Sequence, residues 1–133
     1  MMRESWLPAT PESAPRARAI VREAAAEQGL DGDGAWDLML ATTEAVANAI
    51  RHGAPCQDGG RGILLRVLPW DDGNGLFVEV GDCGTFEASA RPAEHDAEHG
   101  RGIPIITAVV DHFELVPEGP LTRVRFGKRA LAA

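Results

Sequence analysis

Glu44 and Asn48 are four residues apart in the stretch of residues 36–53, WDLMLATTEAVANAIRHG. This spacing places two side chains one turn apart on the same face of an α-helix. A carboxylate there can accept a proton from a hydroxyl group, and a neighbouring amide oxygen can bind a hard cation. The pair therefore predicts a site for proton transfer beside a metal ion. The alternative is a solvated helix face, because Glu and Asn also occur at this spacing without a function.

The composition of residues 36–53 is typical of a helix. The stretch has no proline and no internal glycine, and it is rich in Ala, Leu, Met and Glu. Its apolar residues recur at steps of three and four, as in a helix that packs one broad face. Gly53 supplies a stop, and Arg51 and His52 fall in the last turn, where cations suit the helix dipole. Asn48 is a poor helix former in mid-helix, which favours its use by a group outside the helix.

Two glycine-containing motifs follow later in the chain. Asp82-Cys83-Gly84 comes directly after an apolar strand pattern. Gly100-Arg101-Gly102 precedes an apolar stretch that is short enough to be a helix or a strand, and its flanking residues favour a helix. Glycines before a helix allow backbone N–H groups to approach a phosphate. Each motif also has a simpler interpretation, the first as a turn after a strand and the second as a flexible entry to a helix.

Length, composition and charge limit the class of protein. A chain of 133 residues, 44% hydrophobic and 25% charged, predicts a single domain over residues 1–133 with a hydrophobic core. The net charge of −7 argues against direct binding of nucleic acid or of an anionic membrane. No apolar run approaches the roughly 18 residues of a membrane-spanning helix, and the N-terminus lacks a secretory signal. Cys56 and Cys83 do not make a disulfide framework, so we expect a cytoplasmic protein.

The predicted order of elements indicates how these motifs are positioned. It is a short edge strand at residues 6–8, helices over 14–28 and 36–53, strands at 62–68 and 76–80 around a turn, an irregular polar segment at 85–98, a helix over 103–110, and strands at 113–116 and 122–126. Strands grouped in this way favour an α+β two-layer sandwich over a doubly wound sheet. We expect Thr10 or Ser13 to cap the first helix, Gly29 to end it, and Asp33 to cap the second.

In this order and spacing, the motifs resemble the Bergerat-type ATP-binding fold that gyrase and histidine kinases share. Five segments are similar to the anti-sigma-factor serine kinase branch of this GHKL superfamily: TPESAPRAR, TTEAVANAIRHG, VEVGDCG, HGRGIPIITAVVDHFEL and TRVRF. The resemblance covers essentially the whole chain. It implies a two-layer sandwich with a mixed, mostly antiparallel sheet. It also implies an ATP- and Mg²⁺-dependent protein kinase that phosphorylates a STAS-domain anti-sigma-factor antagonist, binds a sigma factor, and forms a homodimer.

The resemblance also implies a role for each matched residue. Glu44 would be the general base for attack on the γ-phosphate, and Asn48 would be the Mg²⁺ ligand. Asp82 would accept a hydrogen bond from the adenine amino group. The other implied nucleotide contacts are His52, Gly84, Gly100, Arg101, Gly102 and Thr122, with helix capping as the alternative for His52.

Two departures from the family pattern leave another function open. Phe86 stands where the first glycine box commonly has its second glycine, and Pro120-Leu121 precedes Thr122 where a glycine is common. These changes indicate weaker ATP binding within the same fold. The alternative function is therefore a non-catalytic nucleotide-binding or protein-binding module. A histidine-kinase catalytic domain is less favoured, because such domains usually follow a phosphoacceptor helix pair and none is expected before Trp6.

Overall fold

The computed structural model describes residues 2–52, 62–70, 72–82, 102–118 and 121–130. In chain order, the elements are β1 (Arg3–Pro8), α1 (Ser13–Glu27), α2 (Gly32–His52), β2 (Gly62–Pro69), β3 (Gly75–Asp82), α4 (Gly102–Val109), β4 (His112–Glu118) and β5 (Leu121–Arg129).

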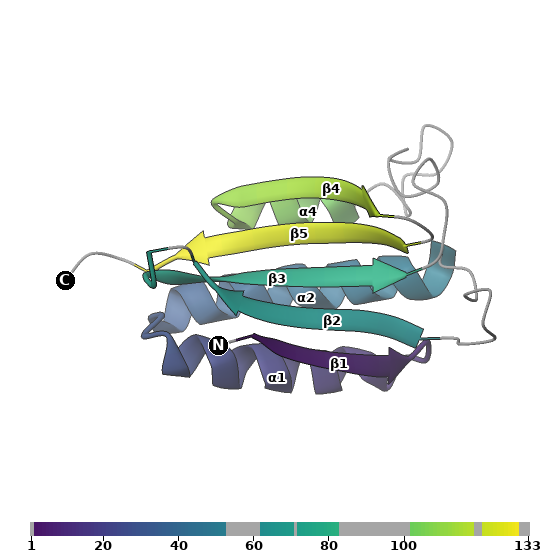
Figure 1. Cartoon of the computed structure of the whole chain (residues 1–133), viewed down its shortest axis with the longest axis horizontal. Coiled ribbons are helices and arrows are strands. Elements are labelled where there is room, and N and C mark those ends of the chain that lie inside the picture. The colour runs from purple at the N-terminus through teal and green to yellow at the C-terminus, as the bar shows by residue number, and fades with distance from the viewer. Residues whose placement is uncertain (1, 53–61, 71, 83–101, 119–120, 131–133) are drawn as a thin grey trace.

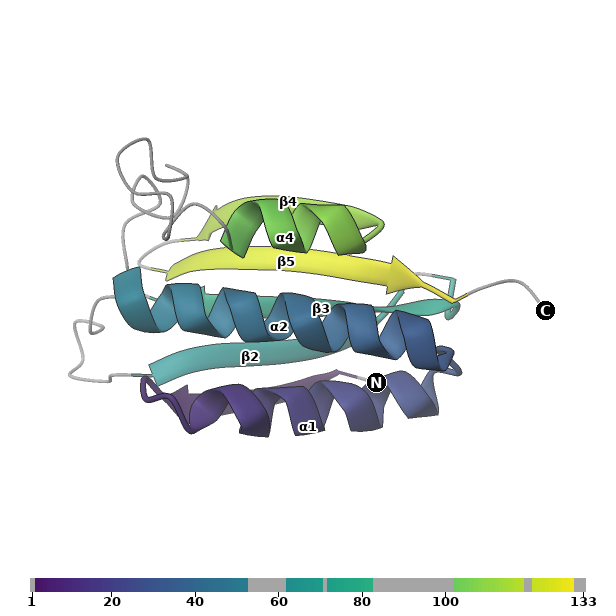
Figure 2. The same ribbon diagram turned by 180° about the vertical axis from the view of Figure 1, so that it is seen from behind.

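The strands form one sheet, and the helices cover one of its faces. The strand order is β1-β2-β3-β5-β4, and each neighbouring pair is antiparallel. Figure 1 shows the open face of this sheet, and Figure 2 shows the helices on the other side. The predicted α+β two-layer sandwich is confirmed, but the described strands include no parallel pair of the kind a mixed sheet would have. None of the described helices is long and apolar enough to cross a lipid bilayer.

The start of α1 differs from the prediction. Glu12 occupies the N-cap position and makes no capping bond with its side chain, so capping by Thr10 or Ser13 is wrong. The Ser13 hydroxyl instead donates a hydrogen bond to the carbonyl oxygen of Pro8, which ties the end of β1 to the helix. Pro15 is accommodated because it lies in the first turn, where a backbone N–H has no partner within the helix.

The end of α1 is fixed by the predicted glycine. Gly29 has a φ of 72°, a left-handed conformation that glycine adopts without strain. Its N–H donates to the oxygen of Ala26 at 3.2 Å, and the N–H of Leu30 donates to that of Ala25 at 3.0 Å. This pair of bonds is a Schellman motif, which satisfies carbonyls at the helix end and turns the chain towards α2.

The start of α2 lies four residues before the predicted one. The carboxylate of Asp31 accepts a hydrogen bond from the N–H of Gly34 at 2.6 Å, and its carbonyl accepts one from Ala35 at 2.9 Å. Asp31 is therefore the N-cap, and the prediction of Asp33 is wrong because Asp33 already lies inside the helix. The helix then continues to His52, as predicted.

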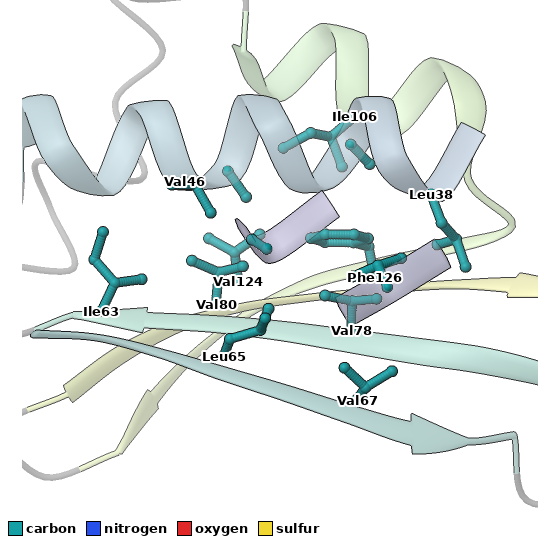
Figure 3. Packing of buried hydrophobic residues seen from close by; sticks show 14 of the residues in the cluster. Leu38, Val46, Ile63, Leu65, Val67, Val78, Val80, Ile106, Val124 and Phe126 are labelled. Carbon is teal, nitrogen blue, oxygen red and sulfur yellow. The ribbon is translucent and has the colours of Figure 1, made fainter. Parts of the chain in front are cut away.

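The core lies between α2 and the sheet. Figure 3 shows side chains of α2, α4 and the strands meeting in this layer. Phe126 and Val78 are fully buried on neighbouring strands, and Leu38 and Val46 are fully buried on the facing helix. Burial of each such side chain stabilises the fold by roughly 1.5–3 kcal/mol. This packing fixes α2 over β3 and β5, and with it the position of every other side chain on α2.

The open face of the sheet carries a charged cluster that the local sequence patterns do not predict. Glu79 is only 4% exposed, and its carboxylate lies 2.6 Å from Nη1 of Arg123, 3.6 Å from Arg66 and 3.8 Å from Arg125. The guanidinium of Arg125 also lies 4.4 Å from the centre of the Phe77 ring. The sequence does contain a signal for this cluster. Arginines alternate with other residues in TRVRF, and a glutamate lies between two valines in VEV, so these strands could form ion pairs if they were neighbours.

Candidate functional site

Four elements meet at one end of the sandwich. The C-terminal end of α2, the last residues of β3, the first residues of α4 and the first residues of β5 lie together on the right of Figure 1 and on the left of Figure 2. The predicted site residues that the structure describes all lie on these four elements.

Glu44 and Asn48 lie on the C-terminal half of α2. The helix is continuous from Gly32 to His52, so the two residues share a face as their spacing predicted. Asn48 is buried, with 8% of its surface exposed, whereas Glu44 is half-buried. Asparagine is mostly exposed in proteins, so its burial near the end of a helix indicates a specific role.

Asp82 and Thr122 lie opposite each other at the same end of the sheet. They are direct partners in the ladder between β3 and β5. Each lies two residues from a buried valine, Val80 or Val124, and side chains two apart in a strand share a face. Asp82 and Thr122 therefore lie on the helix-covered face of the sheet, the face towards α2. Asp82 is half-buried and Thr122 is buried.

The remaining predicted contacts are only partly described. His52 is the last residue of α2 and Gly102 is the first of α4, so their backbones lie at this end of the molecule. Several predicted features lie outside the described residues: Gly84, Gly100, Arg101, the segment 85–98, the departures Phe86 and Pro120, and both cysteines.

The described side chains supply oxygen atoms, which are the ligands that Mg²⁺ prefers. Among the described residues, no group of three or more His, Cys, Asp or Glu could hold a metal ion. A Mg²⁺ ion that accompanies a nucleotide needs only one or two protein oxygens, because phosphate oxygens and water complete its coordination. The amide oxygen of Asn48 fits that requirement. The N-terminus of α4 adds backbone N–H groups, which favour an anion such as phosphate.

Comparison with known proteins identifies the family of the chain. The family model described as "Histidine kinase-like ATPase domain" matches residues 7–127. Serine-protein kinase RsbW of Listeria monocytogenes serotype 4a (strain HCC23) is 31% identical over 121 residues, with 82% of this chain and 75% of that protein covered. RsbW of the serotype 4b strain CLIP80459 matches equally well.

Solved structures show the same fold. The RsbU and RsbW domains of Rv1364c from Mycobacterium tuberculosis match with a TM-score of 0.72 and 26% identity, covering 97% of this chain. This chain spans 32% of that longer protein. The SiaB-SiaC complex from Pseudomonas aeruginosa matches with a TM-score of 0.62, covering 95% of this chain and 88% of that one. Its 12% identity indicates a shared fold only.

The sequence motifs, the two-layer sandwich and these similarities agree. The chain belongs to the histidine kinase-like ATPase domain family, among the relatives of serine-protein kinase RsbW.

Proposed function

We propose that this protein is a cytoplasmic, ATP-dependent protein serine/threonine kinase and anti-sigma factor. It phosphorylates a STAS-domain antagonist and binds a sigma factor. The observation that carries the proposal is the position of Glu44 and Asn48 on α2, at the end of the sandwich where Asp82 and Thr122 face each other. The relatives named serine-protein kinase support the kinase chemistry.

Adenine recognition is assigned to Asp82. Its carboxylate accepts a hydrogen bond from the adenine amino group, whereas the carbonyl oxygen that guanine has at this position would be repelled. The ladder between β3 and β5 holds Asp82 against Thr122, whose hydroxyl can donate to the nucleotide. Gly84 lies two residues beyond Asp82 in the sequence and would let the chain pass close to the base.

Binding of the nucleotide phosphates is assigned to the C-terminal end of α2 and the N-terminal end of α4. The amide oxygen of Asn48 would hold Mg²⁺, which supplies charge neutralisation at the phosphate oxygens. Backbone N–H groups at Gly102 and the first turn of α4 would bind the phosphates. The other assigned contacts are Gly100, Arg101 and His52.

Phosphate transfer is assigned to Glu44. Its carboxylate orients the hydroxyl of the acceptor serine and accepts the proton of that hydroxyl. The serine oxygen forms a bond to the γ-phosphorus, the bond from that phosphorus to the β–γ bridging oxygen breaks, and ADP leaves with the electron pair. Glu44 is half-buried on the same helix face as Asn48, one turn away, so acceptor and phosphate are brought together by one element.

The assembly is proposed from the same family relationship. We propose that the protein acts as a single domain over residues 1–133, as a homodimer, without direct contact to nucleic acid or membrane. The net charge of −7 supports the last point, because the extended phosphate surfaces of nucleic acids and anionic membranes are repelled by a protein of this charge, whereas a single nucleotide can be held locally with Mg²⁺.

The test is phosphate transfer to a purified antagonist. The wild-type protein is incubated with Mg²⁺ and ATP that carries a labelled γ-phosphate, together with candidate STAS-domain proteins. An antagonist whose acceptor serine is replaced by alanine serves as the control. Label that appears on the antagonist with its serine, and not on the alanine control, supports the proposal. Tight Mg²⁺-ATP binding without transfer to any candidate would favour the non-catalytic module, and Phe86 would be the first residue to replace.

A further inference from the structure

A groove lies between α1 and α2. Figure 2 shows the two helices side by side and antiparallel on the helical face of the molecule. The groove has a volume of about 160 Å³, and Arg18, Trp36, Met39, Leu40 and Thr43 line it. The four lining residues of α2 recur at steps of three and four, so they form one stripe along the helix.

Trp36 is the most exposed large hydrophobic side chain among the described residues. Sixty-seven per cent of its surface is exposed, although it lies in a helix beside the apolar side chains of Met39 and Leu40. Trp36, Met39 and Leu40 lie in the N-terminal half of α2, whereas the proposed Mg²⁺ ligand Asn48 lies near its C-terminal end. Thr43, the last residue of the stripe, directly precedes Glu44, so the groove ends beside the proposed nucleotide site and its apolar part lies further from it. The nucleotide chemistry therefore does not account for this exposed apolar surface.

Arg18 forms a positively charged edge of the groove and is held in place. Its Nη1 donates to Oγ1 of Thr43 at 3.1 Å, and the Thr43 hydroxyl donates to the carbonyl oxygen of Met39 at 2.9 Å. Arg22 follows one turn later on the same flank of α1 and is exposed. Within the described part of the chain, no carboxylate forms an ion pair with either arginine, although the protein has 20 acidic and 13 basic residues.

We propose that this groove binds an acidic amphipathic helix of a partner protein. One apolar side chain of that helix packs against Trp36, Met39 and Leu40, and a neighbouring carboxylate pairs with Arg18. A cavity of about 150 Å³ with apolar walls holds one benzene ring, so the volume suits a single large side chain. Trp and Arg are the residues most often dominant in protein interfaces, and an exposed helix pair offers a groove rather than a strand edge.

The test uses the full-length protein and a defined peptide. The peptide is about 18 residues long, sufficient for helix formation, with leucines along one face and glutamates beside them. It carries a fluorescent label, and binding is followed by polarisation. A second peptide has lysine in place of every glutamate. We expect the acidic peptide to bind and the lysine peptide to bind at least about tenfold more weakly, which is about 1.4 kcal/mol.

Variants locate the binding surface. Trp36→Ala should weaken peptide binding by roughly 30-fold, as expected for an interface hot spot. Arg18→Glu should also abolish the preference for the acidic peptide, whereas Arg18→Lys should retain it because the charge remains. Trp6→Ala is the matched control: Trp6 is 55% exposed on the edge strand β1, and its loss should leave binding unchanged. Circular dichroism checks that each variant is folded.

Other results would overturn the proposal. Failure of the acidic peptide to bind, equal binding of both peptides, or an unchanged affinity in Trp36→Ala would each exclude this groove as an acidic-helix site. Binding to phosphatidylserine vesicles that Trp36→Ala abolishes, without peptide binding, would assign the groove to a membrane surface. Dimerisation that Trp36→Ala abolishes in light scattering, without peptide binding, would assign it to a second copy of the chain.

Discussion

Asp82 and Thr122 face each other directly across the ladder between β3 and β5. If Asp82 recognises adenine there, ATP and ADP should bind more tightly than GTP. Asp82→Asn removes one charge-assisted hydrogen bond, which is worth about 1.5–3 kcal/mol, or roughly 10- to 150-fold in affinity. Isothermal calorimetry with the three nucleotides measures both effects.

The control for this variant is Glu114→Gln, on β4. Its carboxylate is exposed and lies near Arg125 on the open face of the sheet, so nucleotide affinity should not change. Equal affinities for ATP and GTP, or an Asp82→Asn variant with wild-type affinity, would remove Asp82 from adenine recognition.

Glu44→Gln should separate transfer from binding. A base acts on the attacking hydroxyl and not on the nucleotide, so Mg²⁺-ATP affinity should stay within a few-fold of the wild type. The transfer rate should fall by roughly 10²- to 10⁴-fold, the usual range for a lost general base. Transfer of labelled phosphate to the antagonist is the measurement, and Glu23→Gln on the exposed face of α1 is the control. A wild-type rate in Glu44→Gln would show that another group is the base.

Asn48→Ala should affect both binding and transfer. The substitution removes the amide oxygen proposed to hold Mg²⁺, so the gain in ATP affinity that Mg²⁺ provides should be lost and transfer should stop. Asn48→Asp retains an oxygen at the same position and should keep most of that gain. Calorimetry of ATP with Mg²⁺ and with EDTA gives the Mg²⁺-dependent part for each variant. The assignment fails if Asn48→Ala responds to Mg²⁺ as the wild type does.

Glu79→Ala should destabilise the protein strongly. The buried carboxylate lies closest to Arg123, whose side chain is only 13% exposed, and its removal takes away this shortest ion pair of the cluster. Arg66 and Arg125 also lose a contact with Glu79, but they keep Glu4 and Glu114 as partners. Breaking such a pair costs about 3–5 kcal/mol of unfolding free energy. Glu114→Ala, whose side chain is 44% exposed, should cost no more than about 1 kcal/mol. Urea unfolding compares the two, and similar losses would mean that burial does not strengthen the Glu79 pairs.

Two glycines around the turn between α1 and α2 should respond to alanine in opposite directions. Nothing would contact an added Cβ at Gly29 or Gly32, so backbone conformation decides the outcome. Gly29 is left-handed, and Gly29→Ala should lower the unfolding free energy by about 1–2 kcal/mol. Gly32 is helical, and Gly32→Ala should be neutral or stabilising by up to about 1 kcal/mol. Thermal unfolding of both variants measures the difference, and the same sign for both would contradict the argument.

Local signals in the sequence predicted most elements of the fold. Apolar patterns located most helices and strands, and α4 was predicted as a helix from the glycines that precede its apolar stretch. Gly29 marked the end of α1 because a left-handed residue is a strictly local requirement. The starts of the two long helices were predicted less well. Several residues near each start can act as caps. At the start of α1, the Ser13 hydroxyl bonds to the carbonyl oxygen of Pro8 and is therefore not used as a cap.

Features that depend on distant residues were missed. β5 extends to Arg129 instead of ending at Phe126, although Gly127 and Lys128 are weak strand formers. Gly127 is accommodated because the Phe77 ring of β3 occupies the space that a Cβ would fill. The arginine cluster around Glu79 also depends on distant residues, because only the register of β2, β3 and β5 brings its members together.

The candidate site was predicted only in part, because some of its geometry depends on distant residues. The spacing of Glu44 and Asn48 sufficed to place them on one helix face. The resemblance implied that Asp82 and Thr122 both contact the nucleotide, but that they face each other follows only from the pairing between β3 and β5, which neither the resemblance nor the local pattern predicted. The groove beside Trp36 could not be predicted from the sequence, because only the arrangement of α1 against α2 leaves this side chain exposed.

β1 comes first in the chain, yet the strand it pairs with follows both long helices. Arg3 faces Val67, and Pro8 faces Gly62. Closing so long a loop costs conformational entropy before any pairing compensates for it, whereas α1 and α2 are neighbours in sequence. We therefore expect the helical hairpin to assemble early and β1 to dock late. Until β1 docks, β2 would be an unpaired edge of the sheet, and we expect a nascent chain to be most exposed to pairing with another chain at this strand.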